Sequence, residues 1–228
     1  VRLALAGLQR STQDLFGAKR QTLTVAGSAS VIALWAVPRL AMLRQLSPAT
    51  VISFATVHRD GDFSMAQADF EIRFGDGHWP GRMVKQLFAE RLAPVVSPVL
   101  VHGSMEAWRK APQIGVSGPR YGWLDWAAEA KVPPPPSPDL RFDSFVQARI
   151  AAIAGEGVLL GSLALLQADL AKKLLVRVPE PEVTMSASYW LTWAPSDDAF
   201  SDHSAVVDAL TSLIAPHQTH RPASKNLQ

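Results

Sequence analysis

The first apolar stretch of the chain, residues 23–46, predicts a buried strand followed by a sharp turn and a long helix. The apolar residues Leu23, Val25 and Ala26 give the strand, and the small residues at 27–30 suit a tight turn or a helix cap. Such a turn exposes main-chain N–H groups at a helix N-terminus, where the helix dipole also favours an anion. A plain connection between two elements has the same pattern, so both interpretations stay open.

Two more strands follow within the first 75 residues. Residues 50–56 are rich in β-branched side chains, and residues 69–75 alternate between apolar and charged positions, as a half-buried strand does. We expect a short helix over residues 63–68 between them. Right-handed crossovers arrange such a β-α-β-α-β series in a parallel, doubly wound sheet. Ligands of these sheets bind outside the carboxyl ends of the strands, here near residues 27–30, 56–59 and 75–78.

Two long extended segments divide the rest of the chain. Residues 84–101 contain Pro94 and Pro98, which argue against a helix in the second half because proline lacks an N–H. The other extended segment is residues 183–193. With a C-terminal helix returning after the second crossover, this pattern predicts an α/β clamshell of two lobes joined by two crossover strands. We expect lobe I at residues 22–93 and 186–216, lobe II at residues 94–185, boundaries near Pro94 and Ser186, and a flexible tail at residues 217–228.

The remaining predicted elements are short. We expect helices over residues 104–110, 144–154, 163–171 and 204–215, strands over residues 158–160 and 174–178, and an exposed proline-rich loop at residues 132–139. Ser144 precedes the second of these helices and is expected to cap it. Trp108, Trp123 and Trp126 lie close together in the sequence. Such an aromatic cluster favours core packing over a cofactor site.

Residues 1–20 carry apolar or small side chains at positions 1, 5, 8, 12 and 15. This spacing keeps one face of a helix against a partner helix. Two heptads are compatible with a dimer seam and equally with a surface helix that packs on its own domain.

Composition narrows the function class only a little. The 228 residues are 48% hydrophobic, which allows a large core, and they include no cysteine, which excludes disulfides, thiolate metal sites and a cysteine nucleophile. A net charge of +2 by itself gives no argument for nucleic-acid binding. No apolar run is long enough for a membrane span, and no secretory leader is visible. We therefore expect a soluble protein without a targeting segment.

Known catalytic motifs are missing from the sequence. There is no G-x-S-x-G elbow, no H-E-x-x-H and no Walker lysine after a glycine loop. His217 and His220 have the spacing of a metal pair, but further ligands are missing around them. His58 and His78 stand alone at predicted strand ends, where a polar lining role is favoured over a general base. We expect no catalytic residues, no metal and no cofactor.

Six segments, in order along the chain, together form a recognisable pattern. They are LTVAGSASVIALWAVPRLAMLRQLSP at 23–48, DFEIRFGDGHWPG at 69–81, ERLAPVVSPVL at 90–100, FDSFVQARIAAIAGEGVLLGSLALL at 142–166, DLAKKLLVRV at 169–178 and YWLTWAP at 189–195. The chain thereby resembles the effector-binding region of LysR-type transcriptional regulators, in particular the branch typified by the glycine-cleavage-system activator. The run IRFGDGHWPG at residues 72–81 carries the most weight for the branch.

The resemblance implies a type II periplasmic-binding-protein fold, in which a small effector binds between two Rossmann-like lobes. It implies that residues 1–20 are the end of the linker helix through which such regulators form homodimers or tetramers. The family's winged helix-turn-helix would precede residue 1, so DNA would be bound only through that absent N-terminal domain. The resemblance also implies a cytoplasmic protein that makes no membrane contact.

The family's effector contacts carry over to positions in both predicted lobes. Those of lobe I are Ser28, Ala29, Ser30, Thr56, His58, Gly75 and Asp76. Those of lobe II are Tyr121, Asp143, Ser144 and Gly161. The predicted final helix departs from the pattern, because it lacks the aromatic residues often found there in this branch.

The effector itself is expected to be a small anion or an amino acid. Helix N-termini at the cleft and the nearby Arg59, Arg73 and Arg120 favour negative charge. The alternative function is an extracytoplasmic solute-binding protein of a transporter, which has the same clamshell without the linker helix or the dimer. An enzyme on this scaffold is a third class, which no set of residues supports.

Overall fold

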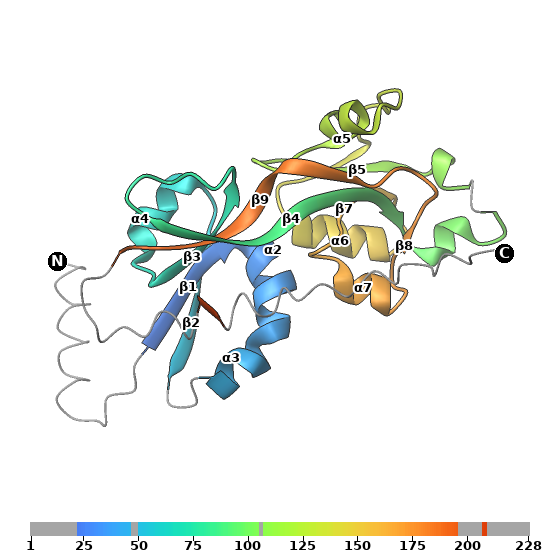
Figure 1. Ribbon diagram of the computed structural model, residues 1–228. Helices are drawn as coiled ribbons and strands as arrows, with labels where there is room; N and C mark the ends of the chain where they lie inside the picture. The colour runs from blue at the N-terminus through green and yellow to red at the C-terminus, as the bar shows by residue number, and fades with distance from the viewer. Residues whose placement is uncertain (1–21, 47–49, 105–106, 196–206, 209–228) are drawn as a thin grey trace, which may run out of the picture.

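The computed structural model describes residues 22–46, 50–104, 107–195 and 207–208, which form a mixed α/β structure around one curled sheet (Figure 1). Its strands run in the order β2-β1-β3-β9-β4-β7-β5-β6, and β8 pairs with β4 off this path. The strands are β1 Thr22–Ser28, β2 Val51–Val57, β3 Phe70–Gly75, β4 Met83–Val96, β5 Gln113–Val116, β6 Leu140–Phe142, β7 Val158–Ser162, β8 Val176–Arg177 and β9 Val183–Trp193.

Short helical segments connect these strands. They are α2 Ala29–Val31, η1 Ile32–Ala36, η2 Val37–Arg39, α3 Leu40–Leu46, η3 Asp60–Asp62, α4 Phe63–Ala66, η4 Pro98–Val101, η5 Ala107–Lys110, α5 Trp123–Ala130, α6 Phe145–Ile153 and α7 Gln167–Ala171. Most of the expected helices and strands are found at their predicted places, with ends that differ by a few residues.

Two long strands, β4 and β9, run through both halves of the sheet and join them. In one half β1 pairs in parallel with β2 and β3, and in the other β5 pairs in parallel with β6 and β7. β4 and β9 are antiparallel to each other and to their neighbours in the two halves. The predicted α/β fold with two crossover strands is therefore confirmed.

The β4–β9 pairing is irregular where the two halves meet. Ala89 pairs with Ser188, whereas Arg91 pairs with Thr184. One residue of β4, Glu90, therefore stands opposite three residues of β9, and such a bulge bends the ribbon. The bend separates the two halves of the sheet and leaves main-chain groups of β9 free to bond elsewhere.

The helix expected after the first strand is not a regular α-helix. β1 continues to Ser28 and the helix begins at Ala29, so no loop separates them. A single α-helical turn leads into π-helical η1, 3₁₀-helical η2 and then α3. Pro38 accounts for the change because it lacks an N–H and clashes with the preceding turn. The guanidinium of Arg39 donates to the Trp35 carbonyl at 3.0 Å, which satisfies an acceptor within the irregular stretch.

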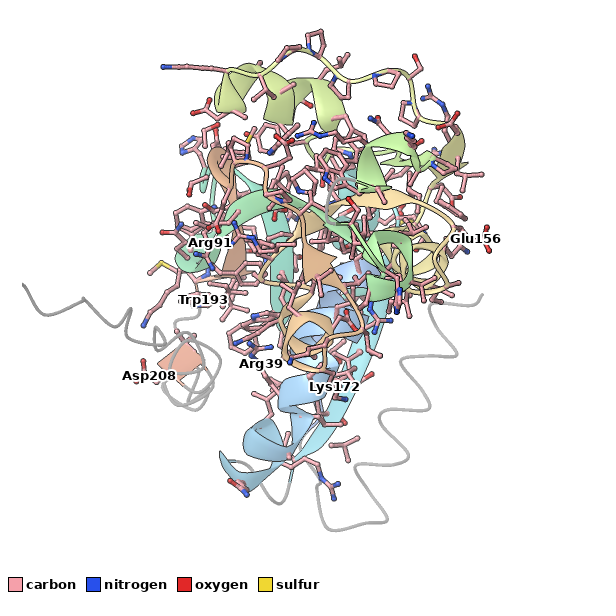
Figure 2. All side chains as sticks on the ribbon, turned by 90° about the vertical axis from the view of Figure 1, so that its right-hand side faces the viewer. Arg39, Arg91, Glu156, Lys172, Trp193 and Asp208 are labelled. Atoms are coloured by element: carbon pink, nitrogen blue, oxygen red, sulfur yellow. The ribbon has the colours of Figure 1, made fainter. Side chains whose placement is uncertain are left out.

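One apolar core extends across the junction of the two halves. It joins side chains that follow β1, such as Val31 and Trp35, to Phe145 of α6 in the other half. Arg39 also donates to Gln167 at 3.3 Å and so lies beside α7 (Figure 2). The two halves therefore bury apolar surface against each other, which stabilises their relative placement.

The tryptophan cluster belongs to a second core. Trp108, Trp123 and Trp126 are buried together in the half that contains β5 and β7. The rings of Trp123 and Trp126 meet edge to face at 5.8 Å, and Trp123 Nε1 donates to the Ile114 carbonyl at 2.9 Å. The prediction of core packing is confirmed.

Further details differ from the sequence prediction, which also did not include helix α5. The short strands β5 and β6 were not expected, because they lie between glycines, prolines and loops that hide their period of two. Ser144 occupies the N-cap position of α6, but its side chain makes no capping hydrogen bond, so that part of the prediction is wrong. The expected strand at residues 174–178 is only two residues long.

Several predictions lie outside the described residues. They concern the helix at residues 1–20, most of the helix at residues 204–215, the tail at residues 217–228, and the pair His217 and His220. Residues 207–208, which are described, are helical. Among the helices of the described segments, none has the length and apolar character needed to cross a membrane.

The loop between β3 and β4 is built around Trp190 of β9. The indole Nε1 donates to the Gly75 carbonyl at 3.0 Å. Gly77 has a φ of 90°, and a Cβ there would lie 2.6 Å from the Trp190 ring. Asp76 Oδ1 accepts from the His78 main-chain N–H at 3.0 Å. The run at residues 72–81 thus owes its glycines and its aspartate to packing and turn geometry.

The replacement Gly77→Ala tests this packing. We expect the free energy of unfolding to fall by about 2–4 kcal/mol, because an L side chain is strained at positive φ and the methyl group would overlap Trp190. Gly81→Ala is the matched control, since Gly81 has a φ of 72° but no atom within 4 Å of the added Cβ. Urea unfolding of both variants measures the difference, and equal losses would contradict the role of Trp190.

Candidate functional site

The carboxyl ends of β1 and β2 lie side by side and present the first group of predicted contact residues. Ser28 pairs with Val57 in the parallel register, and α2 begins directly after it. The Ser28 hydroxyl is the N-cap group and accepts from the Val31 N–H at 3.4 Å. Ser30 is buried, and Ala29 is partly buried. Ser28 therefore has a structural role in starting the helix, whereas Ser30 is not the cap.

Thr56 and His58 are exposed at the end of β2. The main-chain N–H groups of His58 and Arg59 both donate to Asp62 Oδ2, at 3.0 and 2.9 Å. These two hydrogen bonds lower the pKa of Asp62. The segment after β2 is thus fixed by its own turn, and the imidazole of His58 is open to solvent.

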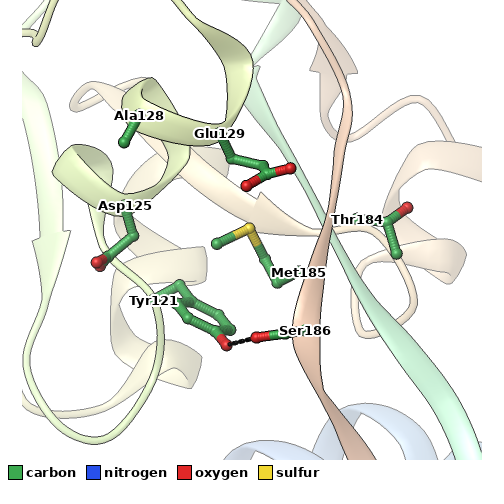
Figure 3. A pocket seen from close by; sticks show the side chains of 7 residues that line it. All are labelled: Tyr121, Asp125, Ala128, Glu129, Thr184, Met185 and Ser186. Carbon is green, nitrogen blue, oxygen red and sulfur yellow. Dashed lines mark hydrogen bonds between the residues drawn. The ribbon is translucent and has the colours of Figure 1, made fainter.

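The far side of the predicted cleft begins with the loop that follows β5. Its Tyr121 hydroxyl bonds to Ser186 Oγ at 2.9 Å (Figure 3). The same hydroxyl accepts from the Ala187 N–H at 3.0 Å. The Tyr121 ring also meets Phe74 of β3 edge to face at 5.9 Å. Ser186 and Ala187 belong to the part of β9 that the bulge leaves unpaired with β4. Tyr121 therefore provides a hydrogen-bond partner for the main chain of β9 where β4 does not, and it connects the two halves of the sheet.

The other predicted residues of this side differ in their surroundings. Asp143 is exposed and Ser144 is partly buried at the start of α6. That helix lies next to α2 of the other half (Figure 1). Gly161 is buried within β7, where a Cβ would lie 2.8 Å from Leu166 and 2.9 Å from Val95. The structure thus places α6, which residues 143 and 144 precede, next to α2, while Gly161 is required by close packing.

A buried polar cluster occupies the junction between these two sides. We call it the junction cluster; it consists of Arg120, Glu90, Tyr189 and Ser162. Arg120, from the loop after β5, donates to Glu90 Oε2 at 3.1 Å and to the Tyr189 hydroxyl. Its guanidinium also lies over the Phe145 ring, 4.5 Å from the ring centre. One arginine thus connects the loop of one half to β4, to β9 and to α6.

Burial governs protonation in the junction cluster. Removal from water raises the pKa of Glu90 above its ordinary value, while Arg120 and the nearby Ser162 hydroxyl oppose that rise. Burial also raises the pKa of the Tyr189 hydroxyl, against the lowering effect of Arg120. Tyr189 is therefore a neutral phenol at neutral pH, and Arg120 is the cation that opposes protonation of Glu90.

Two atoms of the junction cluster are buried without a hydrogen bond among the described residues, namely Glu90 Oε1 and Ser162 Oγ. Buried polar groups of this kind cost roughly 1–3 kcal/mol each when they stay unpaired. Sequence reasoning did not identify Glu90, Ser162 or Tyr189. The available signal was a charged residue at position 90 inside an otherwise apolar extended run.

The three arginines that favoured an anion do not share one place. Arg73 pairs with Glu71 at 2.7 Å and lies over Phe63 of α4, at 4.2 Å from the ring centre. It is therefore held on the α4 side of the sheet, away from the junction cluster. Arg59 is exposed at the start of η3. Only Arg120, among these three, lies at the junction of the halves.

A pocket of about 530 Å³ lies beside the loop after β5, between α5 and β9 (Figure 3). It is lined by Tyr121, Asp125, Ala128, Glu129, Thr184, Met185 and Ser186. Asp125 Oδ2 accepts from the Gly122 N–H at 2.7 Å, so one of the two carboxylates that line the pocket already caps α5. The acidic lining does not suit an anion, and apart from Tyr121 it includes none of the predicted contact residues.

Within the part of the chain that the structure describes, no three His, Asp or Glu side chains come together as a metal site would require. The histidines at positions 58 and 78 are separately exposed at the ends of β2 and β3.

Comparison with known proteins decides the family. The model of the LysR substrate binding domain matches residues 17–215, which is most of the chain. The chain belongs to the LysR substrate-binding-domain family. This match covers every predicted contact residue and the whole junction cluster.

Two curated relatives illustrate the breadth of the match. The HTH-type transcriptional regulator BlaA of Proteus vulgaris is 28% identical over 186 residues, which cover 79% of this chain and 62% of that protein. The glycine cleavage system transcriptional activator of Escherichia coli K12 is 38% identical over 81 residues, which cover 36% of this chain and 27% of that protein. The chain thus spans 62% or less of the length of these LysR-family relatives.

A solved structure agrees with the fold. The effector domain of the transcriptional regulator AmpR of Pseudomonas aeruginosa matches with a TM-score of 0.71 at 26% identity, covering 86% of this chain and 96% of that chain. These relatives are transcriptional regulators, so the alternative of a transporter's solute-binding protein is not favoured.

The replacement Arg120→Met tests the dependence of Glu90 on its partner. We expect a loss of about 3–5 kcal/mol in the free energy of unfolding at pH 7.5, because a buried carboxylate is left unpaired. In the variant, the pKa of Glu90 in the folded state lies further above its pKa in the unfolded state. The free energy of unfolding therefore falls as pH rises between these two pKa values. The loss should therefore be smaller at pH 5.

Urea unfolding at both pH values measures this effect. Arg91→Met is the control, because Arg91 is 53% exposed and pairs with Glu182 on the surface, where such pairs contribute about 0–1 kcal/mol. A loss for Arg120→Met that is small, or that is the same at both pH values, would show that Glu90 does not need Arg120.

Proposed function

We propose that the chain is the effector-sensing domain of a LysR-type transcriptional regulator, and that it binds a small carboxylate or an amino acid between the two halves of its sheet. The observation that carries this proposal is the junction cluster, in which Arg120 of one half reaches both crossover strands. In a family of substrate-binding domains, a buried charged group at the meeting point of the halves is suited to recognise the charge of a ligand.

The proposal assigns the two halves as lobes. Lobe I comprises residues 22–93 and 186–216, and lobe II comprises residues 94–185. The contact between α2 and α6 supports Ser28, Ala29 and Ser30 as one wall, and the position of Asp143 and Ser144 supports the other. Thr56, His58 and Tyr121 would border the opening. Gly75, Asp76 and Gly161 would contribute through their main chains, because their present roles are in packing and turns.

Regulation would follow from a difference in affinity. An effector that binds one arrangement of the lobes better than another shifts the population toward it, typically by about 1–3 kcal/mol of coupling. In the whole regulator, a DNA-binding domain outside these 228 residues would read that shift through a homodimer or tetramer in the cytoplasm. The 38% identity to the glycine cleavage activator supports placement in that branch.

Titration calorimetry tests the proposal with matched pairs of compounds. Acetate, glycine and succinate carry carboxylates, whereas acetamide and glycinamide do not. We expect heat of binding from at least one carboxylate and none from its amide, because Arg120 donates well to a carboxylate. Binding by neutral or cationic compounds alone would contradict the anion preference, and a panel without any binder would contradict the proposed function.

The replacement Ser30→Ala tests the wall at the start of α2. We expect the affinity for a bound carboxylate to fall by about 0.5–1.5 kcal/mol, the value of one hydrogen bond, with little change in melting temperature because Ser30 is not the helix cap. Ser64→Ala serves as the control, since Ser64 is exposed on α4 and bonds to the Gly61 carbonyl. A large loss of stability with intact affinity would assign Ser30 a structural role instead.

A further inference from the structure

The carboxylate of Glu90 is more deeply buried than its partner. Glu90 is 1% exposed, and the groups that face it among the described residues are Arg120 from the loop after β5, Tyr189 from β9 and Ser162 from β7. Arg120 is the cation of this set. Oε2 accepts from it at 3.1 Å, whereas Oε1 is buried without a hydrogen bond. Loss of Arg120 as partner would therefore leave the Glu90 carboxylate buried without a cation.

Arg120 is more accessible than Glu90. Its side chain is 13% exposed, and it belongs to a loop at the carboxyl ends of parallel strands. A guanidinium presents five donors in one plane, and one of its partners, Tyr189, is neutral. Arg120 is thus the member of the pair that a carboxylate from solution would meet first.

Glu90 stands at an irregular place in β4. It is the single residue of β4 opposite three residues of β9 in the bulge, so it is outside the regular ladder of paired residues. The neighbouring Tyr121 holds the same loop to Ala187 of β9 by a separate hydrogen bond. Release of Arg120 from Glu90 would therefore leave the loop attached to the crossover.

We propose that an effector carboxylate replaces the Glu90 carboxylate as the partner of Arg120, and that Glu90 takes up one proton from the solvent in the exchange. This inference rests on the proposed function, because it requires a carboxylate ligand between the lobes. An unpaired carboxylate in a buried position costs several kcal/mol, whereas a carboxylic acid is neutral. The only bond that forms is O–H on Glu90, so charge is conserved at Arg120 and its new partner.

The exchange links effector affinity to pH. Burial already raises the pKa of Glu90 in the ligand-free protein, and loss of Arg120 would raise it further. Between these two pKa values the bound state holds one more proton than the free state. Affinity for carboxylates then falls as pH rises, by up to about tenfold per pH unit. A ligand that adds to Arg120 without displacing Glu90 would show no such dependence.

Calorimetry of the 228-residue chain with acetate and glycine, in two buffers of different ionisation enthalpy, measures the proton directly. For the natural sequence we expect the observed enthalpy to differ between phosphate and Tris by the heat of about one proton per site. For Glu90→Gln we expect no difference between the buffers, and a several-fold tighter affinity that does not vary with pH. Glu182→Gln is the matched control, because Glu182 pairs with the surface residues Arg91 and Arg177 and should leave proton uptake unchanged.

The outcomes separate the two proposals. Carboxylate binding with equal enthalpies in both buffers would overturn the exchange and leave the proposed function standing. Proton uptake that persists in Glu90→Gln would also overturn the exchange, since another group would then be the acceptor. Failure of every compound to bind would overturn the proposed function and the exchange together. The buffer comparison needs only the natural sequence, so it decides the question even when Glu90→Gln does not fold.

Discussion

The pairing of β4 with β9 is the constraint on which the rest of the structure depends. These strands are paired from Met83 with Trp193 to Leu92 with Val183, and each serves both halves of the sheet. The halves therefore cannot separate without breaking a main-chain ladder, and their freedom is confined to the irregular stretch around Glu90. The same stretch is where Arg120 and Tyr121 attach the loop after β5. The stretch around Glu90 thus contains both the bend between the two halves and the charged contact with Arg120.

The site around Glu90 is less positively charged than a count of its nearby arginines indicates. Arg73 shares the carboxylate of Glu71 with Arg82, whereas Arg120 is matched by Glu90 and contributes no unpaired positive charge in the ligand-free protein. A site of this kind selects a ligand by exchange of partners more than by attraction from a distance. Selectivity would then depend on how well the ligand's carboxylate fits the plane of the guanidinium, and on the cost of neutralising the carboxylate that it displaces.

The sequence predicted the fold well because the signals for it are local. The alternating residues 69–75, the prolines of the crossover and the small residues before α2 each act over a few positions. The junction cluster could not be predicted in this way, since Arg120 is 30 residues from Glu90 and 69 from Tyr189. Positions carried over from the family include Tyr121, which bonds to the β9 crossover, and Ser144, which stands at the N-cap of α6. They did not reveal that Gly161 is confined by Val95 and Leu166, because that is a matter of packing between distant strands.

The loop at residues 75–81 has a consequence for how such domains are compared. Its glycines, its aspartate and its hydrogen bond to Trp190 serve the loop's own construction. Two domains that share this run therefore share a way of closing the sheet, but they need not share a ligand. Divergence of chemical specificity is to be sought instead in the loop that carries Arg120 and in the first turns of α2 and α6, where substitution leaves this closure intact.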